Sequence, residues 1–218
     1  MFSRRRLSVK IVYAAFLALI ITLSILSPLF AKDNTNITYI SGDVRIIKNE
    51  SASAPGFVNG IVKTDEQIST GQDSRAELLL PDGTIIRLSS GTKLAFASDN
   101  KELKLVQGVI FIQPDKGAKI KKITTERVSF ETDGASALVE YTPGSYTKFI
   151  TLSGTSRASI NTRFGEWISM EAGKMLILPP ESIKLPDPVE VDLKRLVQTS
   201  KLINSFRDNI EEKKAPTL

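Results

Sequence analysis

Between residues 37 and 178, short runs of alternating apolar and polar residues recur roughly every ten residues. Alternation with a period of two is typical of strands that bury one face, and no long helical period interrupts the stretch. The pattern predicts a mainly β fold, an antiparallel β-sandwich or roll of hairpin-linked strands. The expected strands are 37–48, 76–80, 84–88, 93–97, 103–106, 109–112, 119–125, 128–131, 137–141, 146–152, 157–160, 167–170 and 175–178.

Turn residues separate these runs. The clearest turn contains Asp82, Gly83 and Thr84 after a proline, where aspartate suits a central turn position and glycine accepts a positive φ. Residues 51–60 are rich in Ser, Ala, Pro and Gly and are expected to form a loop. Strand alternation places three carboxylates, Glu77, Glu131 and Glu140, on solvent-facing positions.

The first 31 residues have the pattern of an export segment. Four basic residues lie within residues 1–10, an almost wholly apolar run follows from residue 11, and Pro28 lies near its end. This order predicts a signal peptide cleaved after Ala31. The alternative is an uncleaved anchor formed by residues 11–31, which are enough to span a bilayer. Both interpretations place residues 32–218 outside the cytoplasm, in the periplasm or beyond.

The C-terminal part changes character. A proline-rich connector is expected at 179–188, followed by an amphipathic α-helix over 189–214 with apolar residues recurring every seven positions. One interpretation is that the apolar stripe packs on the sheet. The other is that the helix joins a second copy of the chain or a partner protein.

Charge and residue types limit the function. The chain has a net charge of +5, but four of its 29 basic residues and none of its 24 acidic ones precede Lys32, which leaves the body at +1. A body so nearly neutral offers no basic surface for nucleic acid. The chain contains no cysteine and no histidine. Disulfides, zinc sites of the usual kind and His-based nucleophilic catalysis are therefore excluded.

The remaining chemistry does not indicate an enzyme. Ser90 and Lys93 have the S-x-x-K spacing of acylating enzymes, but Ser90 and Gly91 lie in a turn between strands rather than on a helix, and the companion motifs are absent. A hydrolase that uses only a pair of carboxylates is the third and last-ranked hypothesis. Such an enzyme needs two carboxylates at a set separation, and the sequence does not locate a pair. We expect no enzymatic activity, cofactor or metal.

Four aromatic residues near expected bends are candidates for a binding surface: Tyr141, Tyr146, Phe164 and Trp167. An exposed aromatic group stacks on sugars or on side chains of a partner protein. The commoner use of aromatic residues is packing in the core or at its rim, and both interpretations remain open here.

A series of short motifs appears in a fixed order over residues 42–178, and that series resembles the FecR family. The most specific part lies between Thr70 and Leu94. The motifs are Gly42-Asp43-Val44, a T-G-x-x-S-x-A-x-L run at 70–78, Asp82-Gly83-Thr84, Thr92 with Leu94, an L-x-x-G-x-V/I-x element at 105–111, Phe130-Glu131-Thr132 and Glu171-Ala172-Gly173-Lys174-Met175.

The resemblance implies an extracytoplasmic β domain that acts by binding. The family's namesake relays a signal through a cytoplasmic anti-sigma region, and the residues that precede the leader's apolar run are too few to form one. The leading hypothesis is a non-enzymatic exported protein that binds a protein or ligand in cell-envelope signalling or assembly. The alternative is a secreted module that binds carbohydrate or peptidoglycan.

Overall fold

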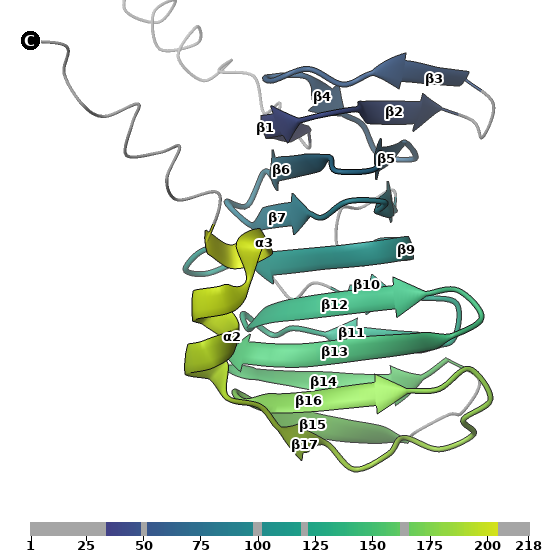
Figure 1. The fold of residues 1–218 in the computed structure, drawn as a ribbon, viewed down its shortest axis with the longest axis vertical. Helices are drawn as coiled ribbons and strands as arrows, with labels where there is room; N and C mark the ends of the chain where they lie inside the picture. Colours follow the sequence, from purple (N-terminus) through teal and green to yellow (C-terminus); the bar gives the residue numbers. More distant parts are fainter. Residues whose placement is uncertain (1–33, 49–51, 98–101, 119–121, 162–165, 205–218) are drawn as a thin grey trace, which may run out of the picture. The chain divides into compact units, whose positions relative to one another are not determined.

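Seventeen strands and two short helices make up the part of the chain that the computed structural model describes (Figure 1). That part comprises residues 34–48, 52–97, 102–118, 122–161 and 166–204. The mainly β fold predicted from the alternating pattern is confirmed. The expected leader and its cleavage point after Ala31 lie outside these residues. Within the described ranges, no helix is both long enough and apolar enough to cross a bilayer.

The strands form two layers, here called sheet A and sheet B, and every pairing is antiparallel except that of β9 with β10. Sheet A contains, in spatial order, β4 (Ile61–Val62), β1 (Thr35–Ser41), β6 (Arg75–Leu79), β7 (Ile85–Leu88), part of β9 (Glu102–Gln113), β12 (Ser136–Thr142), β13 (Tyr146–Ser153), β16 (Lys174–Leu178) and β17 (Val189–Glu190). Sheet B contains β3 (Ala52–Pro55), β2 (Val44–Lys48), β5 (Gln67–Thr70), β8 (Lys93–Phe96), the rest of β9, β10 (Lys122–Thr124), β11 (Val128–Glu131), β14 (Thr155–Ile160) and β15 (Trp167–Glu171).

Strand β9 belongs to both layers and joins them into one hydrogen-bonded network. Its first half pairs with β8 and β10, and its second half pairs with β7 and β12. The crossing point is Gly108, whose φ of +94° is accessible mainly to glycine. The two strands predicted at 103–106 and 109–112 are therefore a single bent strand.

The core lies between the two layers and is filled by alternate residues of their strands. Phe130 of β11 and Phe149 of β13 stack across it, with ring centroids 4.2 Å apart and an interplanar angle of 2°. Both rings are fully buried, and burial of each stabilises the fold by roughly 1.5–3 kcal/mol. The predicted alternation thus identifies the faces that hold the layers together.

The C-terminal helices α2 (Leu193–Thr199) and α3 (Lys201–Asn204) lie against the outer face of sheet A (Figure 1). Leu202 packs there on a second apolar cluster that includes Phe111, Leu138 and Ile150. The predicted start of the helix at residue 189 is wrong, because Val189–Glu190 pairs with β16 as strand β17. Asp192 caps α2 instead, its side chain accepting a hydrogen bond from the backbone N–H of Arg195 at 3.0 Å. Residues 205–214 of the expected helix lie outside the described part of the chain.

The structure corrects two other predictions and adds two strands that the sequence analysis missed. The expected strand 37–48 is two strands, because the chain turns at Gly42, with φ +79°, and passes from one layer to the other. The expected loop at 51–60 contains strand β3, which pairs with β2 despite its small residues. Strands β4 and β5 were not predicted, because β4 has only two residues and β5 contains a single apolar residue, so neither shows an apolar–polar alternation.

Glu77 was predicted to face solvent and is 9% exposed. It does lie on the outer face of sheet A, but the C-terminal helices cover that face beside it. Glu77 forms an ion pair of 2.8 Å with Arg87 and accepts a hydrogen bond from the hydroxyl of Thr38 at 2.9 Å. A buried carboxylate requires such partners, and the sequence pattern does not identify them.

Candidate functional site

The structure describes three of the four predicted aromatic residues and separates them. Tyr141 and Tyr146 line one pocket at the turn between β12 and β13. Trp167 lies elsewhere, on the outer face of sheet B. Phe164 lies outside the described residues. There are thus two candidate surfaces, which we call the tyrosine pocket and the sheet B trough.

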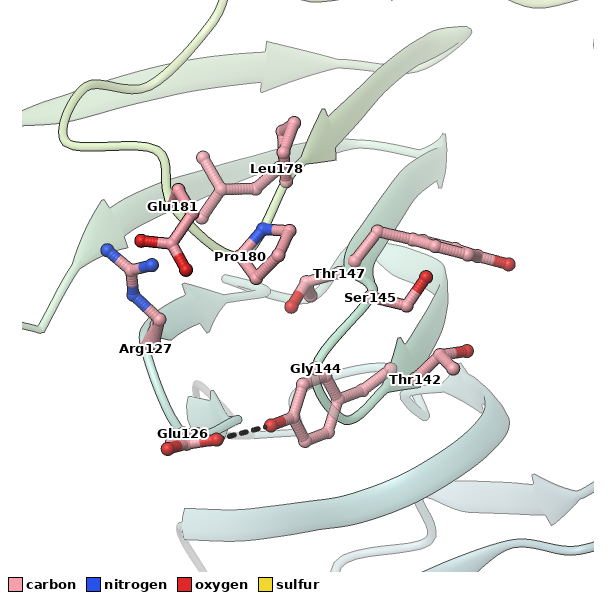
Figure 2. Close-up of a pocket in the computed structure, with 12 residues that line it drawn as sticks. Glu126, Arg127, Thr142, Gly144, Ser145, Thr147, Leu178, Pro180 and Glu181 are labelled. Carbon is pink, nitrogen blue, oxygen red and sulfur yellow. Dashed lines mark hydrogen bonds between the residues drawn. The ribbon is translucent and has the colours of Figure 1, made fainter.

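The tyrosine pocket has a volume of about 270 Å³. Its walls come from three segments that are distant in sequence (Figure 2): the β12–β13 turn around Gly144, the turn between β10 and β11, and the start of the proline-rich connector. Figure 2 shows Arg127 and Glu181 on one side of the pocket and Ser145 on the other. The lining residues are Glu126, Arg127, Tyr141, Thr142, Gly144, Ser145, Tyr146, Thr147, Leu178, Pro179, Pro180 and Glu181.

Hydrogen bonds fix the polar groups of this pocket. The hydroxyl of Tyr141 donates to the carboxylate of Glu126 at 2.7 Å, drawn as a dashed line in Figure 2. Burial, and next the neighbouring carboxylate, raise the pKa of Tyr141 to about 12. Arg127 donates to the backbone carbonyl of Ser182 at 2.8 Å and thereby ties the connector to the pocket. Tyr141 therefore stays protonated at physiological pH and acts as a hydrogen-bond donor.

A second polar group adjoins the pocket on the outer face of sheet A. The carboxylate of Glu140 accepts a hydrogen bond from Tyr146 and forms an ion pair with Lys148. Burial would raise the pKa of Glu140, but the hydrogen bonds from Lys148 and Tyr146 outweigh it and keep that pKa below the ordinary value. The same bond to Glu140 raises the pKa of Tyr146. Glu140 is thus partly buried and held in place rather than freely solvated.

The sheet B trough is larger, about 640 Å³, and more open to solvent. Ser129, Ser159 and Thr124 form its floor, because strand alternation directs these short side chains to the outer face of sheet B. Trp167 forms one wall and is 56% exposed. The guanidinium of Arg157 lies 4.6 Å from the centroid of its ring. The full lining is Glu102, Lys104, Lys122, Thr124, Thr125, Ser129, Glu131, Arg157, Ser159, Ile160, Asn161, Glu166 and Trp167.

Other residues considered in the sequence analysis form hydrogen bonds within turns. Ser90 is a turn residue whose hydroxyl donates to the carbonyl of Gly71 at 3.3 Å and accepts from the N–H of Asp73 at 3.0 Å. In the turn at Asp82 and Thr84, the side chain of Asp82 accepts from the backbone N–H of Thr84 at 3.1 Å. Among the described residues, no group of three or more acidic side chains is arranged to hold a metal ion.

Sequence reasoning missed several lining residues. Glu126 and Arg127 lie in a turn between two predicted strands, and nothing in their local pattern indicates the contact of Arg127 with the connector 55 residues later. The floor of the trough had a recognisable pattern, since Thr124, Ser129 and Ser159 occupy alternate outward positions of predicted strands. What the sequence did not supply was the order of those strands in the sheet.

Residues 66–155 match the model of the FecR protein family. The predicted resemblance is confirmed for this stretch, while the motifs at Gly42-Asp43-Val44 and 171–175 lie beyond it. No curated protein sequence is significantly similar to the chain.

Two crystal structures of a "putative anti-sigma factor" from Parabacteroides distasonis share the fold. The structure at 1.65 Å resolution is 16% identical with a TM-score of 0.52, and the match covers 60% of this chain and 62% of that chain. The structure at 2.50 Å resolution is 15% identical, with the same TM-score and coverage. This chain thus spans less than two thirds of that relative, and at this identity the likeness is evidence for the fold alone.

Proposed function

From the match of residues 66–155 to the FecR family, we propose that this chain is an exported, non-enzymatic protein that binds a protein partner in cell-envelope signalling or assembly. The basic, apolar leader pattern supports export. The absence of histidine and cysteine from the sequence supports a role in binding rather than catalysis. The two β layers, which strand β9 joins, would serve as a rigid support for the binding surface.

The tyrosine pocket is the partner-binding site of this proposal, and its size carries the argument. At about 270 Å³ it lies at the lower limit of small-molecule pockets, which begin near 300 Å³. A pocket of this size suits one anchoring side chain of a partner protein, and such anchors dominate the affinity of many interfaces. Ile183 in the adjoining connector is 63% exposed and would extend the contact area.

The lining indicates the chemistry of the anchor. Glu126 and Glu181 contribute two carboxylates against one guanidinium, that of Arg127. Two tyrosines and two prolines complete the walls. An excess of negative charge beside aromatic rings favours a lysine or arginine side chain, which gains both Coulomb and cation–π attraction.

The test places a photocrosslinking amino acid at Ser145, an exposed residue of the pocket rim, in the full chain expressed in its host. We expect a crosslink to one envelope protein, and we expect the Glu181→Lys substitution to remove it. A matched probe at Asp65, which is not part of the pocket lining, should give no such crosslink. A chain that fractionates with the cytoplasm, or a crosslink that survives Glu181→Lys, contradicts the proposal.

A further inference from the structure

The outer face of sheet B carries a cross-strand row that runs through the sheet B trough. Strand register places Lys104, Thr124, Ser129, Ser159 and Trp167 side by side on five successive strands. Neighbouring strands lie about 4.8 Å apart, so the row extends over roughly 19 Å. Its middle three residues are short, which leaves a channel between the lysine at one end and the indole at the other. That length suits a chain-like ligand that lies across the strands.

The floor of the trough is suited to polar contacts on a neutral ligand. The hydroxyl of Ser159 can act as donor and acceptor, whereas that of Thr124 donates to the carboxylate of Glu102 at 3.2 Å and offers a ligand its oxygen as an acceptor. The hydroxyl of Ser129 donates to the side-chain carbonyl of Asn161 at 2.5 Å, and the amide of Asn161 donates to the carbonyl of Thr125 at 3.3 Å. These bonds orient the Asn161 amide at the edge of the trough. The same amide also donates to the carbonyl of Glu126 at 3.4 Å, so Asn161 shapes the edge of the trough and leaves the polar contacts with a ligand to the floor.

The charges of the trough balance. Its lining holds three cations and three carboxylates, namely Lys104, Lys122, Arg157, Glu102, Glu131 and Glu166. Two of the pairs are joined, Lys122 to Glu102 and Arg157 to Glu131, each at 3.7 Å. A site for a polyanion needs a surplus of cations, and this one has none. The balance therefore favours an uncharged ligand with many hydroxyl groups.

Trp167 supplies the apolar part of the site. Its ring is one of the most exposed large apolar groups among the described residues, although tryptophan usually buries most of its surface. Stacking with Arg157 restrains the indole at the wall of the trough. Pyranose rings present a C–H face that packs on indole rings while their hydroxyl groups reach polar neighbours. The combination of a restrained indole and a hydroxyl floor matches that requirement.

We infer that the sheet B trough binds a neutral oligosaccharide strand, with one sugar against Trp167 and the following sugars over Ser159 and Ser129. A peptide fits this site less well. Extended peptides usually add to a free sheet edge through main-chain hydrogen bonds, whereas the strands of the floor, β10, β11 and β14, are paired on both sides. The inference concerns a different face from the tyrosine pocket and stands independently of the proposed protein partner.

The experiment is co-sedimentation of the full-length protein with three insoluble polymers: cellulose, chitin and peptidoglycan sacculi. We expect binding to at least one of them, and we expect Trp167→Ala to raise the apparent Kd about 30-fold, as loss of an aromatic hot spot does. Ser159→Gln, which places a longer side chain in the middle of the floor, should also weaken binding. Phe57→Ala is the matched control, because Phe57 is 65% exposed and is not part of the trough lining.

Several outcomes overturn the inference. The inference is wrong if the unaltered protein binds none of the three polymers. It is also wrong if Trp167→Ala and Ser159→Gln are retained as well as the unaltered protein. Loss of binding between about 0.1 and about 1 M salt would show that the contact is ionic rather than neutral. Binding to sacculi alone that soluble chitin oligosaccharides do not displace would identify a peptide as the ligand. Retention on cellulose or chitin, both of which are uncharged, supports the neutral glycan.

Discussion

The guanidinium of Arg87 donates a hydrogen bond of 2.7 Å to the backbone carbonyl of Ile203 in helix α3, 116 residues later in the chain. The same guanidinium forms the 2.8 Å ion pair with Glu77 and lies 5.6 Å from the ring centroid of Phe111. Both charged side chains are almost fully buried. Arg87 therefore links the middle of sheet A to the C-terminal helix, and both depend on it.

Replacing Arg87 with methionine should be strongly destabilising. The substitution leaves the Glu77 carboxylate buried without its cation and removes the anchor of α3, and we expect a loss of about 3–5 kcal/mol. Urea unfolding followed by circular dichroism measures the loss. Faster trypsin cleavage at Lys194 and Lys201 would report release of the helices.

A double-mutant cycle with Glu77→Gln separates the pair from general damage. Because the two residues share one interaction, the double variant should lose less stability than the sum of the single variants. Strict additivity, or a loss of under about 1 kcal/mol for Arg87→Met, would contradict the role given to this ion pair.

The stacked rings of Phe130 and Phe149 lead to a second prediction. Phe149→Ala opens a cavity between the two layers and should lower the free energy of unfolding by about 3–5 kcal/mol. Phe57→Ala removes a ring that is 65% exposed, and its effect should stay within about 0.5 kcal/mol. Thermal or urea denaturation of both variants compares them directly, and similar losses would contradict the assignment of the core.

The sequence predicted the strands better than their partners. Alternation located most strands of the FecR-like region and identified which residues point inward, because burial of one face imposes a period of two. It did not reveal that Gly108 lies within one strand that passes between the layers, since a glycine between two apolar runs usually marks a turn. The positive φ of Gly108 and the close approach of Thr92 together show why the position is glycine.

The candidate sites show the same division. Tyr141 and Tyr146 are close in sequence, and the pocket does contain both. Trp167 was grouped with them because of sequence proximity, but the chain crosses from sheet A to sheet B between Tyr146 and Trp167. Glu77 was assigned to the correct face and the wrong environment, because its partners Thr38 and Arg87 lie on other strands. Contacts between distant segments set the chemistry of both sites, and local patterns carry no information on them.

Gly108→Ala tests the crossing of β9 between the layers. The new Cβ would lie 2.5 Å from the backbone Cα of Thr92, in addition to the cost of a positive φ. We expect a loss of about 3 kcal/mol, the upper end of the usual range for a point substitution. Gly144→Ala is the matched control, because its φ is +71° with no neighbouring atom within 4 Å, and it should lose only about 1–2 kcal/mol. Equal losses for the two variants would show that the crowding at Thr92 does not matter.

The bond between Tyr141 and Glu126 predicts a specific dependence of stability on alkaline pH. The folded-state pKa of about 12 exceeds the ordinary value of 10.0, so the folded protein holds the phenolic proton more tightly than the unfolded chain does. Its contribution to stability is therefore complete below pH 10 and is lost as the pH rises from 10 towards 12. Tyr141→Phe should cost about 1 kcal/mol at neutral pH, and this difference from the unaltered protein should shrink across that interval. Lysine titration affects both proteins alike, so urea midpoints compared at each pH isolate the tyrosine. A difference that stays constant up to pH 12 would contradict the raised pKa of Tyr141.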